Sequence, residues 1–123
     1  MDLQTITTEK RASLRFDVVF PVVLSSEEFG RIRCIARNVS AGGMFVEALE
    51  PLPIGLPVKV HFTMERAAGE IIARAEIKNH YYLAFRQGNE LRSLIGMGLK
   101  FSEFEAGSDE SFGRSLTRCK TIH

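Results

Sequence analysis

Two segments of the sequence carry side chains suited to gripping a small anionic ligand. The first, Lys10-Arg11-Ala12-Ser13-Leu14-Arg15, places two arginines four residues apart in a basic stretch after a polar terminus. Arg11 and Arg15 would lie about 13 Å apart along an extended strand but only about 6 Å apart around a helical turn. A bent arm could therefore close both guanidinium groups on one anion through charge-assisted hydrogen bonds.

The second segment, Asn38-Val39-Ser40-Ala41-Gly42-Gly43, follows a row of outward arginines, Arg31, Arg33 and Arg37. Asn, Ser and paired glycines suit a tight turn, because Asn tolerates the left-handed backbone region and glycine has no Cβ to clash. On residue types alone, the segment is more simply a connector between strands than a ligand site. Its amide and hydroxyl groups could nevertheless bond a base or a phosphate.

The elements that must position these segments are β-strands. Apolar residues recur with a period of two from Phe16 onward, the pattern of strands with one buried face. An open sheet of six or seven such strands would expose two edges, so a small antiparallel β-barrel, closed or nearly closed, is the best architecture. The expected strands are 16–24, 31–37, 44–48, 58–64, 71–78, 81–85 and 95–101.

The last of these strands has glycines on one face and apolar residues on the other. Ile95, Met97, Leu99 and Phe101 are expected to point inward, which leaves glycines 96 and 98 on the outer face. The segment Gln87-Gly88-Asn89, just before this strand, has the composition of a hairpin tip.

A short C-terminal helix is expected to pack on the barrel. Phe112, Leu116 and Cys119 recur at helical spacing behind Ser108-Asp109-Glu110, whose residue types suit a helix start. Gly113 weakens this helix by about 1 kcal/mol of intrinsic propensity.

The length and composition are those of one small globular domain. The chain has 123 residues, with 45% hydrophobic and 25% charged residues. We expect residues 1–15 to form a mobile arm, residues 16–101 the barrel, and residues 102–123 the helix and a tail. No segment approaches the roughly 18 apolar residues of a membrane span, and the start lacks the order of a secretory signal, so a cytoplasmic location is the default expectation.

The charge balance argues against a polymer of nucleic acid as the ligand. Sixteen basic residues against fifteen acidic ones leave a formal charge of +1, so no overall field attracts a polyanion or an anionic membrane. The outward strand faces also lack an evident aromatic stacking platform.

Metal chemistry and catalysis have no evident residues here. Cys34 and Cys119 form neither a disulfide framework nor a metal-ligand cluster and are expected to be reduced thiols. His61, His80 and His123 lack partners at ligand spacing and are expected to be surface residues. No nucleophile, phosphate-loop or clustered-carboxylate motif is present, so we expect no enzyme, no metal and no catalytic residue.

Two short motifs of a known family occur in the family's order. The first is RxxxR, and the second, about 23 residues later, is [D/N]xSxxG. The residues that match them are Arg11, Arg15, Asn38, Ser40 and Gly43. With the β pattern between and after these motifs, the chain resembles the PilZ family of bacterial receptors. The resemblance covers roughly residues 10 to 101, including the glycine-spaced last strand.

This resemblance implies binding of cyclic di-GMP, with no other cofactor. In the family the two arginines hold phosphates and guanine edges, and the Asn or Asp and the Ser complete the contacts. Asparagine at position 38 supplies less electrostatic help than aspartate would to guanine N–H donors, so we expect some loss of affinity. Further candidate ligand-binding residues are Lys10, Gly42, Arg37, Arg74 and Gly98.

The function that follows is a receptor that changes conformation on binding cyclic di-GMP and signals to a separate effector protein, in motility, polysaccharide export or development. The alternative is an adaptor of the same fold that binds no nucleotide and uses its arginines on an acidic partner. Ligand stoichiometry and self-association, a homodimer included, are left open by the sequence.

Overall fold

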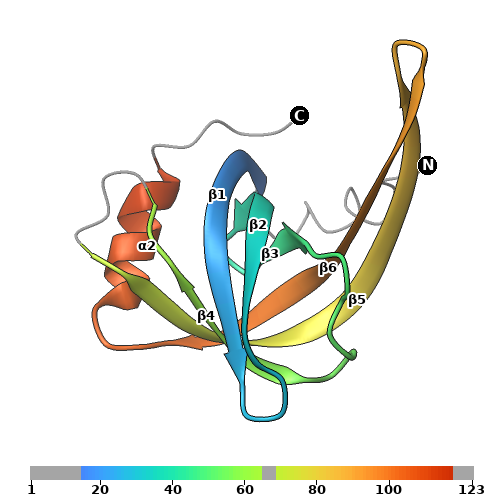
Figure 1. The fold of residues 1–123 in the computed structure, drawn as a ribbon. Coiled ribbons are helices and arrows are strands. Elements are labelled where there is room, and N and C mark those ends of the chain that lie inside the picture. The colour runs from blue at the N-terminus through green and yellow to red at the C-terminus, as the bar shows by residue number, and fades with distance from the viewer. Residues whose placement is uncertain (1–14, 65–68, 118–123) are drawn as a thin grey trace.

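Six strands close into one antiparallel barrel in the computed structural model, which describes residues 15–64 and 69–117 (Figure 1). Around the barrel the strands pair in the order β1-β2-β3-β6-β5-β4, and β4 pairs back with β1. The predicted barrel and its C-terminal helix are confirmed. The elements are β1 (Arg15–Ser26), β2 (Gly30–Ser40), β3 (Gly43–Glu47), β4 (Pro57–Phe62), β5 (Ile71–Gln87), β6 (Glu90–Phe104) and α2 (Ser108–Leu116).

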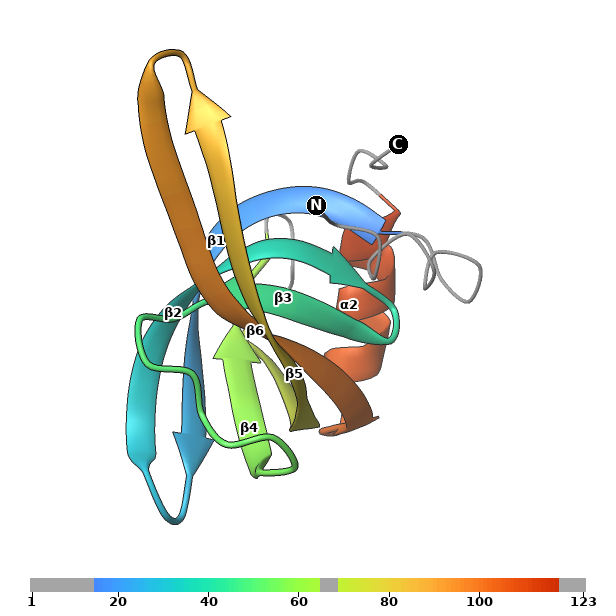
Figure 2. The same cartoon turned by 90° about the vertical axis from the view of Figure 1, so that its right-hand side faces the viewer.

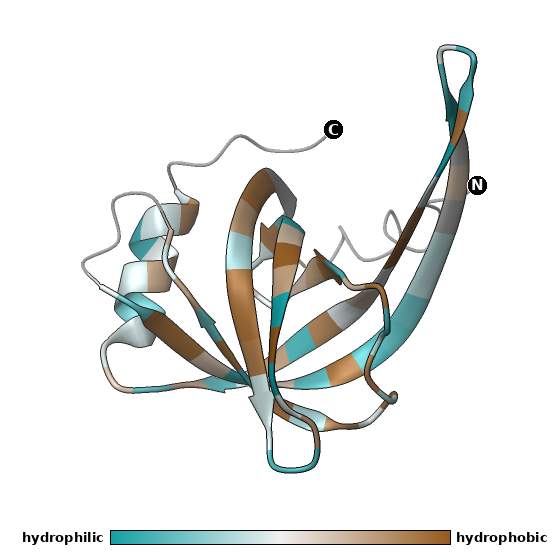
Figure 3. Cartoon of the chain, viewed as in Figure 1, coloured by the Kyte–Doolittle hydropathy of each residue, from teal (hydrophilic) through white to brown (hydrophobic). Residues whose placement is uncertain are grey.

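The barrel interior is filled by the alternating apolar residues that the sequence predicts. Hydrophobic positions alternate with hydrophilic ones along several strands, as a one-sided strand requires (Figure 3). Ile95 is only half-buried, because it lies where β6 leaves the barrel. The core residues contributed by β4 to β6 and their flanks are Val58, Val60, Phe62, Met64, Ile71, Ala73, Ala75, Ile77, Met97, Leu99 and Phe101.

Strands β5 and β6 are longer than the sequence pattern indicates. The segments expected at 71–78 and 81–85 form one strand of 17 residues, and the strand expected at 95–101 runs over 15 residues. The register of β5 against β6 shifts between Ile77 and Asn79, so Lys78 is an extra residue that breaks the alternation. The first residues of β6, from Glu90 to Ser93, are exposed, so no apolar alternation marks them.

Helix α2 packs against the barrel through Phe112. Its ring stacks on Phe104 with centroids 5.1 Å apart and meets Phe62 and Phe101 edge-on at 5.8 and 5.5 Å. The helix cap is Gly107, in the left-handed region with φ 85°, rather than a polar side chain. The hydroxyl of Ser108, which the sequence offers as a cap, instead accepts a hydrogen bond from the Ile72 amide at 3.0 Å and ties the helix to β5.

The two described histidines make contacts that the sequence does not indicate. His80 is exposed, as expected, but its Nε2 donates to the Leu52 carbonyl at 2.6 Å and holds the loop before β4 against β5. His61 is half-buried rather than a free surface residue, and its ring lies 3.3 Å from the Ser25 hydroxyl and 3.8 Å from Glu70. His123 and Cys119 lie outside the described residues. No helix in the described ranges has the length and apolar content needed to traverse a bilayer.

Replacing Phe112 with alanine should lower the free energy of unfolding by about 3–5 kcal/mol, because the ring is 3% exposed and packs on three other rings. The neighbouring change Gly113→Ala is a matched control on the exposed side of the same helix. It should raise stability by about 0.5–1 kcal/mol through helix propensity. Urea unfolding measures both, and equal effects of the two changes would contradict this packing.

Burial raises the pKa of the Cys34 thiol above its usual value by desolvation, which disfavours the reactive thiolate. In a Cys119→Ser variant, Cys34 should therefore react slowly with a thiol reagent at pH 8 and fully once the protein is unfolded in urea. Rapid labelling of the folded protein, followed by absorbance, would show that the thiol is accessible.

Candidate functional site

Pairing of β1 with β2 brings the two sequence motifs together. Arg15, the last residue of RxxxR, is the Cα partner of Ser40, and Asp17 is the partner of Asn38. Arg15 is described through its backbone, whereas Arg11 and Lys10 lie outside the described residues. The end of one motif therefore sits directly across a strand pair from the other.

A β-bulge at Arg37 decides which way the second motif faces. The register of β2 against β3 shifts between Ala36 and Asn38, so Arg37 is an extra residue. Before the bulge Ala36 points into the core, and after it Val39 does, both with 0% exposure. Uninterrupted alternation would have sent Asn38 and Ser40 inward with Ala36. The bulge places both on the outer face instead.

Ser40 organises the turn that joins β2 to β3. Its hydroxyl accepts from the Gly42 amide at 3.3 Å and donates to the Gly43 carbonyl at 3.4 Å, both long for such bonds. The carbonyl of Gly42 in turn accepts from the Phe101 amide at 2.8 Å, which ties the turn to β6. Only Ala41 and Gly42 form the turn, so half of the segment expected to be a connector belongs to β2, and its last residue, Gly43, begins β3.

Glycine at position 43 allows β3 and β6 to approach closely. A Cβ on Gly43 would lie 2.0 Å from the Leu99 carbonyl oxygen and 3.2 Å from its carbon. Backbone cannot rotate away as a side chain can, so no larger residue fits without moving a strand. Nothing lies within 4 Å of a Cβ built on Gly42. The second glycine of the pair is therefore required by packing, and the first is not.

The outer face beside the motif carries an aromatic pair that sequence reasoning missed. Asn38 is the Cα partner of Phe45, and Phe45 is the partner of Gly98. A Cβ on Gly96 would come within 2.8 Å of the Phe45 ring, and one on Gly98 within 3.2 Å of the Tyr81 ring. The two rings meet edge-on at 5.2 Å. The two glycines predicted for the outer face thus lie against these rings, and their lack of side chains makes room for them.

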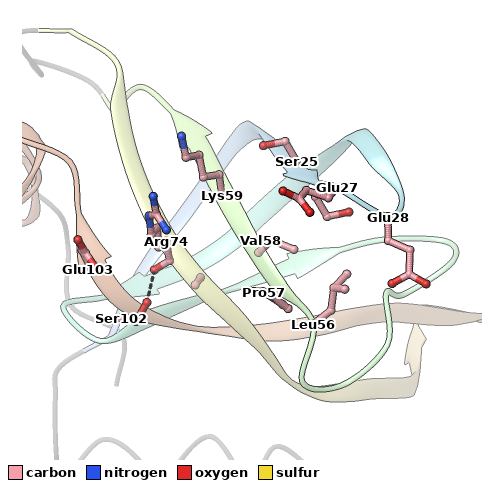
Figure 4. Close-up of a pocket in the computed structure, with 12 residues that line it drawn as sticks. Ser25, Glu27, Glu28, Leu56, Pro57, Val58, Lys59, Arg74, Ser102 and Glu103 are labelled. Atoms are coloured by element: carbon pink, nitrogen blue, oxygen red, sulfur yellow. Dashed lines mark hydrogen bonds between the residues drawn. The ribbon is translucent and has the colours of Figure 1, made fainter.

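The additional arginines lie in different places. Arg37 is exposed beside the motif and pairs with Glu47 at 3.8 Å. Arg74 lies on β5 opposite Lys59 and Glu103. It lines an open groove of about 1030 Å³ whose wall includes the β1–β2 hairpin end (Figure 4). The structure therefore does not group Arg74 with Asn38 and Ser40.

The groove in Figure 4 has a mixed lining and no concentration of one charge. Glu27 and Glu28 face it from the hairpin end, with Lys59 and Arg74 on the opposite wall. Lys59 is already paired with Glu105 at 3.0 Å. Among the residues that the structure describes, no group of three metal-ligating side chains occurs either. The best candidate site is therefore the outer face at the start of β1 and the end of β2.

Comparison with known proteins identifies the family. The family model described as PilZ domain matches residues 9–118, and the chain belongs to this family. No curated protein sequence matches the chain significantly.

Three solved structures illustrate the likeness in fold. The PilZ domain of YcgR from Escherichia coli, solved with c-di-GMP, has a TM-score of 0.70 at 14% identity and covers 88% of this chain and 90% of that one. The K. pneumonia MrkH–c-di-GMP complex gives 0.65 at 14% identity over 85% of this chain and 50% of that one. The Bacillus subtilis inhibitor of motility, MotI, gives 0.60 at 22% identity over 88% and 52%. The chain spans about half the length of the last two.

Gly43→Ala should lower the free energy of unfolding by about 3 kcal/mol, the upper end for overpacking, because its Cβ meets backbone rather than a flexible side chain. Gly42→Ala is the matched control and should change stability by less than about 0.5 kcal/mol. Thermal and urea unfolding of the two variants test this. Similar stability for both would mean that β3 and β6 do not approach as closely as described.

Proposed function

We propose that this protein is a receptor for cyclic di-GMP, held by Arg11, Arg15, Asn38, Ser40 and Gly43. The observation that carries the proposal is the strand register that sets Arg15 opposite Ser40 on a chain of the PilZ family. The YcgR and MrkH structures named above, both described with c-di-GMP, support the choice of ligand.

The chemistry of the two arginines fits this ligand. A guanidinium can bond a phosphate or the O6 and N7 edge of guanine with two parallel hydrogen bonds, and it can also stack on a purine. Arg15 begins β1, so Arg11 comes four residues before the barrel begins. We place Lys10, Gly42, Arg37 and Gly98 next to this site as further candidates, and the groove position of Arg74 leaves it out.

Binding at this site requires a local rearrangement. Asn38 is 9% exposed and Ser40 is 2% exposed, so a ligand reaches them only if their surroundings shift. The bonds that Ser40 makes within the turn, at 3.3 and 3.4 Å, are weak ones to exchange for a phosphate or base contact. This rearrangement is the conformational change that we propose a separate effector protein detects in the cytoplasm. The protein acts without catalysis.

Titration calorimetry of the full chain with cyclic di-GMP tests the proposal, with GTP and cyclic GMP as ligand controls. Binding with a Kd at or below about 10 µM is expected, and Arg11→Ala or Arg15→Ala should each weaken it about 10- to 100-fold, the worth of one charge-assisted contact. Arg74→Ala is the matched control, an exposed arginine at the groove, and should leave the Kd unchanged.

Asn38→Asp should tighten binding in the same titration, because a carboxylate accepts more strongly from guanine N–H groups.

Absence of heat, and of thermal stabilisation, at about 1 mM ligand would overturn the receptor proposal, because even a millimolar Kd would be detectable there. An equal loss of affinity in the Arg74 and Arg15 variants would place the ligand elsewhere on the barrel.

A further inference from the structure

Strands β5 and β6 continue beyond the barrel as a two-stranded ribbon. Strand β4 pairs with β5 only as far as Glu76, and β3 pairs with β6 only from Gly96 to Lys100. The two long strands nevertheless pair with each other up to Gln87 and Glu90. Figures 1 and 2 show this ribbon projecting well past the other strands. A ribbon of two strands is marginally stable in water by itself, so its outer surface is a place to look for a partner.

The outer edge of β5 offers unpaired backbone groups. From Lys78 to Gln87, no strand in residues 15–64 or 69–117 pairs with β5 on the side away from β6. Such an edge of ten residues is about 33 Å long.

The hairpin turn fixes which residues direct their amides and carbonyls toward this edge. A two-residue turn makes Gln87 and Glu90 a hydrogen-bonded pair, and the pairs alternate from there. Tyr82, Ala84 and Arg86 therefore turn their backbone groups outward. Ile95 is the Cα partner of Tyr82, and its carbonyl accepts a hydrogen bond from the Ala48 amide on the side away from β5. This bond agrees with the alternation, in which Tyr82 and Ile95 both direct their backbone groups away from each other.

The two edges of the ribbon differ in composition. Tyr81-Tyr82-Leu83-Ala84-Phe85 on β5 is a run of five uncharged residues, and Tyr82 is 70% exposed. On β6, Glu90 and Arg92 flank Leu91 and form an ion pair at 3.4 Å. Charged residues on an edge strand discourage pairing, whereas an uncharged, β-prone edge is a template for another strand. The β5 edge is therefore the one suited to pairing.

We propose that this edge pairs antiparallel with the same edge of a second copy, so that two ribbons form one four-stranded sheet. A two-fold axis at Leu83 sets Tyr82 opposite Ala84 of the partner copy and His80 opposite Arg86, all residues whose backbone groups point outward. No two formal charges of like sign then face each other, whereas an axis at Tyr82 would set Lys78 against Arg86. A net charge of +1 per chain adds little repulsion.

Two exposed apolar side chains lie on or beside β6, on the side of the ribbon away from the β5 edge. Leu91 is 72% exposed near the tip. Leu49 is 92% exposed at the base, directly after the residue whose amide bonds Ile95. A stable dimer needs about 800 Å² of buried surface on each copy, which the ten-residue β5 edge has to supply without these two side chains.

Sedimentation equilibrium of the full chain from about 1 µM to about 1 mM, without any nucleotide, tests the proposal over the range in which moderate dimers dissociate. The expected mass at the upper end is twice the chain mass of 13.8 kDa. Ala84→Pro removes an amide at the β5 edge and should weaken dimerisation at least about tenfold. Ser93→Pro is the matched control, because Ser93 is exposed, lies directly opposite Ala84 and turns its amide to the other edge.

Tyr82→Lys gives a second, gentler variant that puts a charge on the β5 edge at a 70% exposed position and should also shift the equilibrium to monomer. Circular dichroism checks that each variant folds. A wild-type chain that stays monomeric throughout would overturn the proposal. So would a dimer that survives both β5 changes, or one that the two prolines weaken equally.

Discussion

The break in alternation at Arg37 is the constraint on which the site depends. One extra residue in β2 keeps Val39 in the core and places Asn38 and Ser40 on the outer face of the barrel, where other residues cover them. A barrel this small tolerates no polar amide inside without partners, so the phase of β2 is set by burial of its apolar residues. The pairing of β2 with β1 then places Arg15 opposite Ser40.

Three glycines of this barrel serve the packing of strands rather than turns. Gly43 lets β3 lie against the backbone of Leu99, and Gly96 and Gly98 make room for the rings of Phe45 and Tyr81. Gly43, which the motif associates with ligand binding, therefore also has a structural role in the barrel. Changes at Gly43 therefore need a stability control before any effect on binding is assigned to contact with a ligand.

The motif face, the groove and the ribbon lie at different ends of the strands. The motif face lies where β1 begins and β2 ends, and the mixed-charge groove of Arg74 includes the opposite end of the same two strands. The ribbon extends from β5 and β6 instead. Gly98 and its neighbours on β6 connect the ribbon to the motif face, because β6 pairs with β3, the strand that directly follows the motif turn. A dimer formed through the ribbon would leave the motif face of each copy free.

The sequence alone determined the barrel, its core and the family, because strand periodicity and two motifs are local patterns that burial and chain chemistry impose directly. It also placed Arg15 and Ser40 in motifs without showing that they face each other. Only the tertiary structure decided that, since the register of β1 against β2 depends on irregularities between Asp17 and Phe20 and at Arg37 that a strict period of two cannot reveal. The aromatic pair of Phe45 and Tyr81 and the projecting ribbon were likewise beyond the sequence, because each depends on which distant strands become neighbours.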